Sequence, residues 1–177
     1  EIGEPGRYAP EAVASEAHRA LAREAAVKSM VLLKNAPLAD SRPVLPFEMT
    51  RVRSLAVIGT LAAEPNIGDY GSSRVRPPHV VTPLAGIRAA SGDAIAVAWD
   101  NGRRIAQAAE AARRADAAIV IAGSTHRDEG ERMSRWVGGD RDSLRLAPHD
   151  EALIRAVLEA NPRTAVVLMG GSAFITE

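Results

Sequence analysis

Two carboxylates, Glu129 and Glu131, flank Gly130 in a charged stretch, residues 125–144, which we call the acidic loop. If both enter one partly desolvated cleft, their mutual repulsion raises the pKa of one of them, which then keeps its proton near neutral pH. Glycoside cleavage needs a protonated carboxyl group of this kind to protonate the leaving oxygen. It also needs a second carboxylate about 5–5.5 Å away in a retaining enzyme, and nothing in the segment obviously supplies it.

The same loop carries Trp136, one of two tryptophans in a chain with 3% aromatic residues. An aromatic ring among carboxylates and guanidiniums is typical of sugar sites, because it stacks on C–H groups while the charges bind hydroxyls. A calcium site is not expected, because the carboxylates do not alternate around a fixed central glycine and interleaved arginines repel a cation. A solvated loop with self-compensating charges is the plainer alternative.

A glycine-rich stretch from Gly68 to Val75 holds short polar side chains. Asp69, Ser72 and Ser73 are of the kind that bind sugar hydroxyls. Dinucleotide binding is not expected, since neither Gly-x-Gly-x-x-Gly nor Gly-Lys-Ser/Thr follows the preceding apolar run. A surface loop with tight turns at Gly68 and Gly71 is the alternative.

Helical and strand patterns alternate along the chain. Apolar spacing of three and four after Pro10 predicts an amphipathic helix through Ala25. Two more helices are expected, one after a cap at Asp100 or Asn101 and one from Pro148 to Asn161. Apolar runs of strand length, which indicate strands covered on both faces, occupy residues 54–59, 94–99, 117–123 and 164–169.

This alternation predicts an α/β three-layer sandwich with a mainly parallel sheet flanked by helices, in a flavodoxin-like topology. Ligands of such sheets approach the carboxyl ends of the strands. The glycine-rich loop and the acidic loop both follow strands, so both are expected at those ends.

Composition excludes several classes of partner. The 22 Lys and Arg balance the 22 Asp and Glu, so neither nucleic acid nor a membrane is an expected partner. No apolar run approaches the ~20 residues of a membrane helix. The chain lacks cysteine, and neither a metal nor a cofactor is expected. Without cysteine or a targeting pattern, the compartment stays open, with the cytoplasm slightly favoured.

The ends of the chain predict a piece of a longer polypeptide. Residues 1–10 are interpreted as an interdomain linker and residues 11–177 as one α/β-sandwich domain. The chain starts without Met and stops soon after its last strand.

Short motifs in order along nearly the whole chain resemble the second, α/β-sandwich domain of family 3 glycoside hydrolases. They are HRALAREAAVKSMVLLKN (18–35), VLPF (44–47), LAVIG (55–59), GDYGSSRVRP (68–77), TPLAGI (82–87), DEGE (128–131), GGDRDSLRL (138–146) and DEALI (150–154). The resemblance implies a preceding barrel domain, absent from this chain, that supplies an aspartate nucleophile. It also implies that this domain lends loops to the active site. Because the family usually continues beyond residues 164–169, the sheet is expected to lack a strand or two at its C-terminal end.

Carried over residue by residue, the resemblance implies an acid/base glutamate at Glu131, with Glu129 as the alternative. The family's Asp-Arg pair corresponds to Asp140 and Arg141, and Arg141 joins Asp69, Ser72, Ser73 and Trp136 as expected substrate contacts. The eight residues between Glu131 and Asp140 form a longer gap than in compact members, which leaves the choice of glutamate open.

The implied activity is retaining hydrolysis of a terminal β-linked glucoside or xyloside, with the barrel domain of the same polypeptide as partner. The segment alone is expected to be inactive, because it holds only one of the two carboxylates. The alternatives are a non-catalytic carbohydrate-binding or packing module and, less in keeping with the motifs, a flavodoxin-like nucleotide binder.

Overall fold

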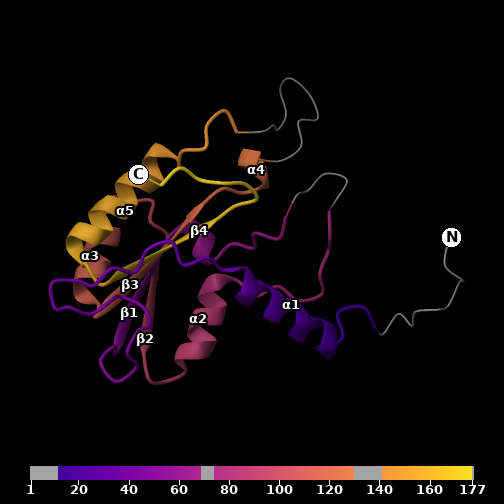
Figure 1. Cartoon of the computed structure of the whole chain (residues 1–177), viewed down its shortest axis with the longest axis horizontal. Coiled ribbons are helices and arrows are strands. Elements are labelled where there is room, and N and C mark those ends of the chain that lie inside the picture. The colour runs from indigo at the N-terminus through magenta and orange to yellow at the C-terminus, as the bar shows by residue number, and fades with distance from the viewer. Residues whose placement is uncertain (1–11, 69–73, 130–140, 177) are drawn as a thin grey trace, which may run out of the picture. The chain divides into compact units, whose positions relative to one another are not determined.

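The computed structural model describes residues 12–68, 74–129 and 141–176. The chain divides into two compact units, one of residues 1–35 and 76–79 and one of residues 36–75 and 80–177. Helix α1 belongs to the first unit, and the strands of the described residues all belong to the second (Figure 1). The second unit therefore contains the sheet that positions the functional loops.

Helix α1 (Glu16–Ser29) starts later than its sequence predicts. The side chain of Ser15 accepts a hydrogen bond from the backbone N–H of His18, which caps the helix at Glu16. The predicted start at Pro10 is wrong, because residues 13–14 form a turn and Ala14 has a positive φ of 54°. No residue of α1 is buried.

Four parallel strands form the sheet, in the order β2-β1-β3-β4. This order and the helices between the strands confirm the predicted three-layer sandwich and its flavodoxin-like topology. The strands are β1 (Ser54–Ile58), β2 (Ala96–Asp100), β3 (Ala117–Gly123) and β4 (Thr164–Met169). Three of them lie where the apolar runs predict them, whereas β2 begins at Ala96 rather than at residue 94.

Helices cover both faces of the sheet (Figure 1). On one face, α3 (Ile105–Arg114) and α5 (Pro148–Ala160) bury Ala108, Ala112, Leu153 and Val157 against the strands. On the other face, α2 (Pro83–Ser91) and the short helix η2 (Thr60–Ala62) contribute Leu84, Leu61 and Ala62 to a second apolar cluster. The predicted cap of α3 at Asp100 or Asn101 is wrong, because the helix begins after Arg104. The Asp100 and Asn101 side chains instead accept hydrogen bonds from the N–H groups of Gly102 and Arg103, just before the helix.

Helix α2 was not predicted from the sequence, although its signals are local. The Thr82 side chain accepts a hydrogen bond from the N–H of Ala85, and Pro83 occupies the first helical position. Both features are typical of a helix start, because the cap satisfies an unpaired N–H and proline has none to satisfy.

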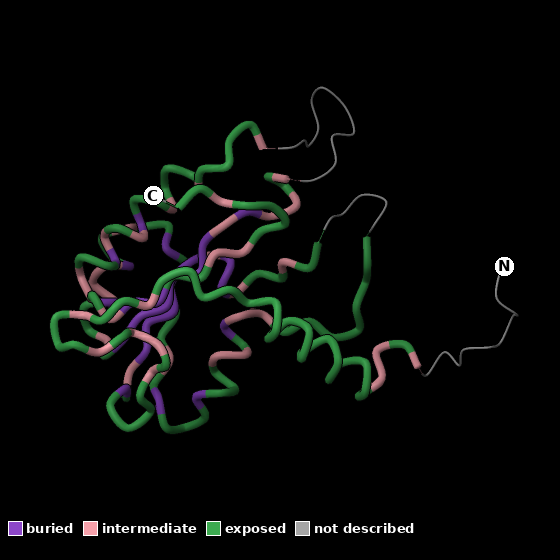
Figure 2. Tube along the Cα trace, in the orientation of Figure 1, coloured by how far each residue is buried: buried purple, intermediate pink, exposed green. Residues whose placement is uncertain are grey.

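The two central strands are almost entirely buried, whereas β2 has no buried residue and β4 has only its first two, Thr164 and Ala165 (Figure 2). β1 and β3 are covered on both faces, as predicted. For β2 and β4 the prediction of full burial is wrong, because each has a neighbour on one side only. Trp99 on β2 is 42% exposed and Val167 on β4 is 40% exposed.

A single carboxylate joins the amino ends of β1 and β3. Asp116 Oδ2 accepts hydrogen bonds from the N–H of Arg53 (2.9 Å), the N–H of Ser54 (2.8 Å) and the hydroxyl of Ser54 (2.9 Å). The hydrogen bond from the Arg53 N–H, followed by the two from Ser54, lowers the pKa of Asp116. These hydrogen bonds join β1 to the start of β3 at the amino edge of the sheet, and they involve no residue at the carboxyl edge.

At the carboxyl edge, β1 is followed by Gly59 and β3 ends at Gly123, and neither position can accommodate a side chain. Gly59 has φ 117° and Gly123 has φ 137°, both in the region that favours glycine. A Cβ at Gly59 would overlap the carbonyl oxygen of Ile121, and one at Gly123 would overlap that of Met169. The close approach of β3 and β4 at their carboxyl ends therefore depends on Gly123.

Replacing Gly123 by alanine is expected to lower the free energy of unfolding by at least about 3 kcal/mol, because backbone strain adds to overlap with Met169. Denaturant unfolding followed by circular dichroism measures the loss. Gly92→Ala is the matched control, since Gly92 has φ 52° but no neighbouring atom within 4 Å of a new Cβ. The control should cost about 1–3 kcal/mol, because φ 52° and ψ −144° strain an alanine backbone without any overlap. Equal losses in the two variants would show that the close approach of β3 to β4 does not require glycine at position 123.

Candidate functional site at the carboxyl edge of the sheet

The strand order reverses between β1 and β3, and the predicted loops start there. The chain leaves β1 toward β2 on one side, whereas it leaves β3 toward β4 on the other. Such a switch point is where open α/β sheets bind ligands, because the diverging loops leave a crevice. The segments that lead into these loops are joined, since the Asn66 side-chain amide donates a 3.0 Å hydrogen bond to the carbonyl of Ser124.

A short helix, α4 (His126–Glu129), begins the acidic loop after β3. Thr125 N–H and Oγ1 donate hydrogen bonds of 2.8 and 3.0 Å to Asp128 Oδ2, and the Asp128 N–H donates to the Thr125 carbonyl. The reciprocal bonds resemble a capping box, which fixes the direction in which the chain enters a helix. This turn was not predicted from the sequence, and it determines where Glu129 lies.

The Glu129 carboxylate binds the segment that follows β4. Its Oε1 accepts a 2.5 Å hydrogen bond from the N–H of Gly171, and its Oε2 accepts a 2.8 Å hydrogen bond from the hydroxyl of Ser172. The side chain is 15% exposed. Glu129 is therefore directed toward the end of β4 and is largely shielded from solvent.

Arg141 joins the same contacts from the far end of the acidic loop. Its Nη2 donates to Ser172 Oγ (2.5 Å) and to the carbonyl of Ala173 (2.6 Å), while Nε lies 3.5 Å from Glu129 Oε2. The guanidinium carbon lies 4.5 Å from the centroid of the Phe174 ring. The arginine side chain is 10% exposed. We call Glu129, Arg141, Gly171, Ser172 and Phe174 the loop-base cluster.

Within this cluster Glu129 is held in its ionised form. Burial by itself raises the pKa of Glu129, but the N–H of Gly171, the hydroxyls of Ser172 and Ser124 and the charge of Arg141 together bring the pKa below its ordinary value. The sequence predicted a raised pKa for one member of the Glu-Gly-Glu pair. Glu129 is not that member.

The amino end of α5 lies beside the end of β3. Asp150 accepts a 3.4 Å hydrogen bond from the N–H of Gly123, and His149 Nε2 lies 3.0 Å from the carbonyl oxygen of Gly102. Burial raises the pKa of Asp150. The hydrogen bond from the Gly123 N–H and the charge of His149 oppose this rise, whereas the charge of nearby Asp128 reinforces it. These contacts join α5 to the carboxyl edge without using any predicted site residue.

Two of the predicted site residues, Glu129 and Arg141, are thus brought into contact. Sequence reasoning missed their partners Gly171, Ser172 and Phe174. The Gly-Gly-Ser directly after β4 could have indicated them, because it follows a strand at the carboxyl edge. The other predicted residues lie outside the described part of the chain: Asp69, Ser72, Ser73, Glu131 and Trp136.

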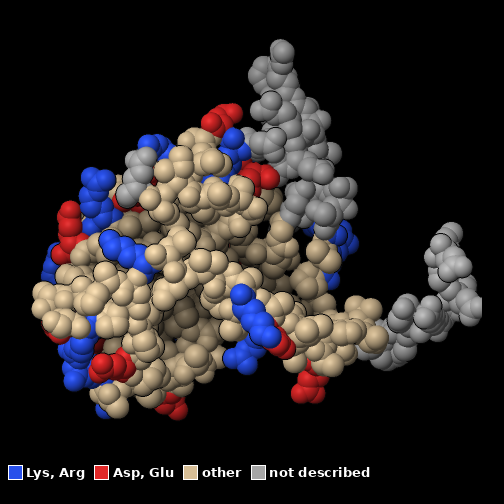
Figure 3. All heavy atoms as spheres, viewed as in Figure 1, with Lys and Arg blue, Asp and Glu red and all other residues tan. Residues whose placement is uncertain are grey.

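Nothing in the described residues gathers as a metal site, since no group of three or more His, Cys, Asp or Glu comes together there. Acidic and basic side chains are interspersed over the face shown in Figure 3. Each helix in the described ranges is too short or too polar to cross a bilayer.

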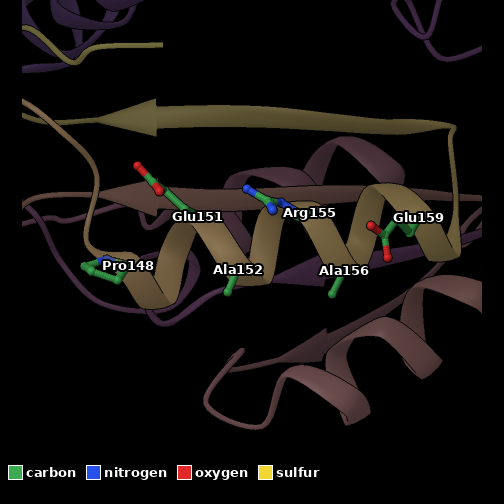
Figure 4. A pocket seen from close by; sticks show the side chains of 6 residues that line it. All are labelled: Pro148, Glu151, Ala152, Arg155, Ala156 and Glu159. Atoms are coloured by element: carbon green, nitrogen blue, oxygen red, sulfur yellow. The ribbon is translucent and has the colours of Figure 1, made fainter. Parts of the chain in front are cut away.

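A shallow groove of about 270 Å³ runs along the outer side of α5 (Figure 4). The described side chains that line it all come from this one helix: Pro148, Glu151, Ala152, Arg155, Ala156 and Glu159. No polar groups from a second element converge on the groove, as a ligand site requires. The loops at the carboxyl edge are therefore the better candidate.

The fold and this site define a flavodoxin-like α/β domain whose polar groups gather beyond the carboxyl ends of its strands. Residues 30–177 match the Glycosyl hydrolase family 3 C-terminal domain, and the chain belongs to that family. The resemblance inferred from its motifs is thereby confirmed.

Relatives and solved structures agree with this assignment. A beta-xylosidase of Formosa agariphila is 32% identical over 170 residues, covering 89% of this chain and 22% of that protein. Thermostable beta-glucosidase B of Acetivibrio thermocellus is 33% identical and covers 89% and 20%. The structure of a β-glucosidase from Erythrobacter marinus matches with a TM-score of 0.76 at 27% identity, covering 89% and 24%. The chain thus spans about a fifth of the length of these relatives.

Replacing Glu129 by glutamine is expected to lower the free energy of unfolding by about 1–3 kcal/mol near neutral pH, because buried hydrogen bonds and the charge partner of Arg141 are lost. A carboxylate whose pKa is lowered by folding stabilises the fold above its unfolded pKa of about 4.5, and this contribution disappears as the pH falls through the folded value. Denaturant unfolding over a pH series should therefore show the cost shrinking below pH 4.5.

Glu159→Gln, on the exposed side of α5, is the matched control and should change stability little at any pH. A cost for Glu129→Gln that stays constant down to acidic pH would show that Glu129 is not held as a carboxylate.

Proposed function

We propose that this chain is the second domain of a retaining β-glycosidase that releases terminal β-linked glucose or xylose. The observation that carries the proposal is the Glu-Gly-Glu loop of a family 3 domain, which starts directly after β3 at the switch point of the sheet. The β-xylosidase and β-glucosidase names of its relatives support the sugar class.

In the proposed reaction, Glu131 is the acid/base residue. An aspartate of a barrel domain attacks the anomeric carbon, while Glu131 gives its proton to the departing glycosidic oxygen. Glu131 then removes a proton from the water that attacks the glycosyl-enzyme, so that the sugar leaves with its original anomeric configuration. The loops after β1 and β3 supply the sugar contacts, with Asp69, Ser72, Ser73 and Trp136 as the candidates.

The surroundings of Glu129 favour Glu131 for this role. A general acid must hold a proton near neutral pH, whereas the loop-base cluster stabilises Glu129 without one. An ionised Glu129 also favours the protonated form of a second carboxyl group near it.

Replacing Glu131 by glutamine in the complete polypeptide is expected to slow cleavage of unactivated β-glycosides by about 10²–10⁴-fold, because no group protonates the leaving oxygen. Dinitrophenyl glycosides, whose leaving groups need no proton, should still form the glycosyl-enzyme. Added azide should then restore turnover and yield a glycosyl azide, since azide needs no general base.

Glu129→Gln is the matched comparison and should show no rescue by azide. Rescue of Glu129→Gln, and none of Glu131→Gln, would exchange the two assignments. If neither variant alters the dependence on leaving group and only KM rises, the domain is a binding module rather than part of the catalytic apparatus.

The purified 177-residue chain is expected to hydrolyse neither aryl β-glucosides nor aryl β-xylosides, because the proposed nucleophile belongs to another domain. A sensitive release assay with nitrophenyl glycosides measures this, with the complete polypeptide as the positive control. Turnover by the isolated chain at a rate proportional to its concentration would contradict a nucleophile outside it.

A further inference from the structure

Helix α1 and the residues that follow it carry an unusual share of exposed apolar side chains. Residues 16–34 are all exposed (Figure 2). Seven of the eighteen large hydrophobic residues that are exposed in the described ranges lie between residues 13 and 33. Protein surfaces rarely gather apolar side chains in this way unless another surface packs against them.

The densest part is the run of four aliphatic residues from Met30 to Leu33, which are 65–78% exposed. Helix α1 ends at Ser29, and Met30 has extended backbone with φ −71° and ψ 131°. Side chains of a chain that leaves a helix in this way spread over more than one side of the backbone. A run without polar residues is typical of a segment covered on both sides, since one with a side in water alternates.

Helix α1 is well formed locally but has no core of its own. The Ser15 cap and the salt bridge between Lys28 and Glu24 support it. Isolated helices shorter than about 12–15 residues are marginal in water, and most helical stability in proteins comes from packing of one side. α1 has 14 residues, and none of them is buried. The helix therefore needs a partner surface.

The two sides of α1 differ, which indicates the side that packs. Ala17, Leu21 and Ala25 recur at four-residue spacing and so share one side of the helix. Arg19 and Arg23 lie on the opposite side. Leu21 is 62% exposed. Alanines on either side of it allow another surface to come close, while the two arginines stay in water.

The relatives indicate what the partner is. The match to the C-terminal domain begins at residue 30, so α1 lies before the matched part. The chain spans 22% and 20% of the β-xylosidase and the β-glucosidase, so most of such a polypeptide lies outside it. A neighbour on the same polypeptide is present at a high effective concentration, which favours it over a second copy.

We propose that α1 and residues 30–33 form the surface on which the preceding domain of the same polypeptide packs. The facing surface of that domain is apolar, and it covers the Leu21 side of α1 and the run from Met30 to Leu33. This inference goes beyond the proposed function, because it assigns an interface and needs no catalytic role for any residue. The two can therefore fail separately.

Thiol labelling of the complete polypeptide and of the 177-residue chain tests the interface. Leu32→Cys and Leu33→Cys place single thiols in the apolar run, and the 177 residues contain no other cysteine. We expect maleimide to modify both thiols at least about tenfold more slowly in the complete polypeptide, because the reaction needs an accessible thiolate. Mass spectrometry of the labelled peptides separates these thiols from any cysteine elsewhere in the complete polypeptide.

Two further variants are the controls. Arg114→Cys replaces a side chain of α3 that is 78% exposed, and it should react at the same rate in both forms. Val120→Cys replaces a fully buried side chain of β3 by one of similar size. It should stay unreactive in both forms, which shows that the sheet is folded.

Three other labelling patterns would overturn the proposal. Rapid labelling of Leu32→Cys and Leu33→Cys in both forms would mean that the surface is open. Equal protection in both forms, at any concentration, would mean that residues 36–177 cover it. Protection that grows with the concentration of the 177-residue chain would mean that a second copy covers it.

Photo-crosslinking in the complete polypeptide identifies the partner without the isolated chain. With Leu21→benzoylphenylalanine, the cross-linked peptides should come from residues that precede this chain. Cross-links to residues 36–177, a covalent dimer of two polypeptides, or the absence of any cross-link would each overturn the assignment. Neither experiment measures glycoside hydrolysis, so an error in the proposed function would leave their outcome unchanged.

Discussion

The parallel pairing of β1 with β3 is the constraint on which the rest of this domain depends. Both strands are buried on both faces, so their backbone groups must bond to each other and to the edge strands. Because the strands run in the same direction, the loops that follow them emerge at one edge. The segments that leave β1, β3 and β4 therefore start at the same edge of the sheet.

At that edge, the fold balances the cost of taking charges out of water. Glu129 and Arg141 are both largely buried, and an unpaired charge in such a place would be strongly destabilising. The N–H of Gly171 and the hydroxyl of Ser172 donate hydrogen bonds to the Glu129 carboxylate. The Arg141 guanidinium contacts the Ser172 hydroxyl, a backbone carbonyl and an aromatic ring. These partners account for the lowered pKa of Glu129.

The sequence was most informative where structure follows from local patterns. β1, β3, β4 and α5 lie where apolar runs, Pro148 and Asn161 predict them, because burial and capping depend on neighbouring residues. α3 also forms, but it begins after Arg104 rather than at the predicted cap. It was less informative where neighbours decide the outcome. The runs of β2 and β4 resemble those of buried strands, and only the strand order reveals that both lie at an edge.

The candidate site also has one part that follows from local sequence and another that depends on residues distant along the chain. The acidic loop and its place at the carboxyl edge could be predicted, since both follow from a strand with a polar sequence after it. The ionised state of Glu129 could not, because its partners Gly171 and Ser172 lie 42 and 43 residues along the chain. A spacing argument treats Glu129 and Glu131 alike and does not reveal contacts with a segment so distant along the chain.

Asp116 gives this architecture a further property. By joining the amino ends of β1 and β3, it anchors the sheet on the side remote from the variable loops. Changes in the segments beyond the carboxyl ends therefore leave that anchor untouched, so those segments can vary without loss of the scaffold.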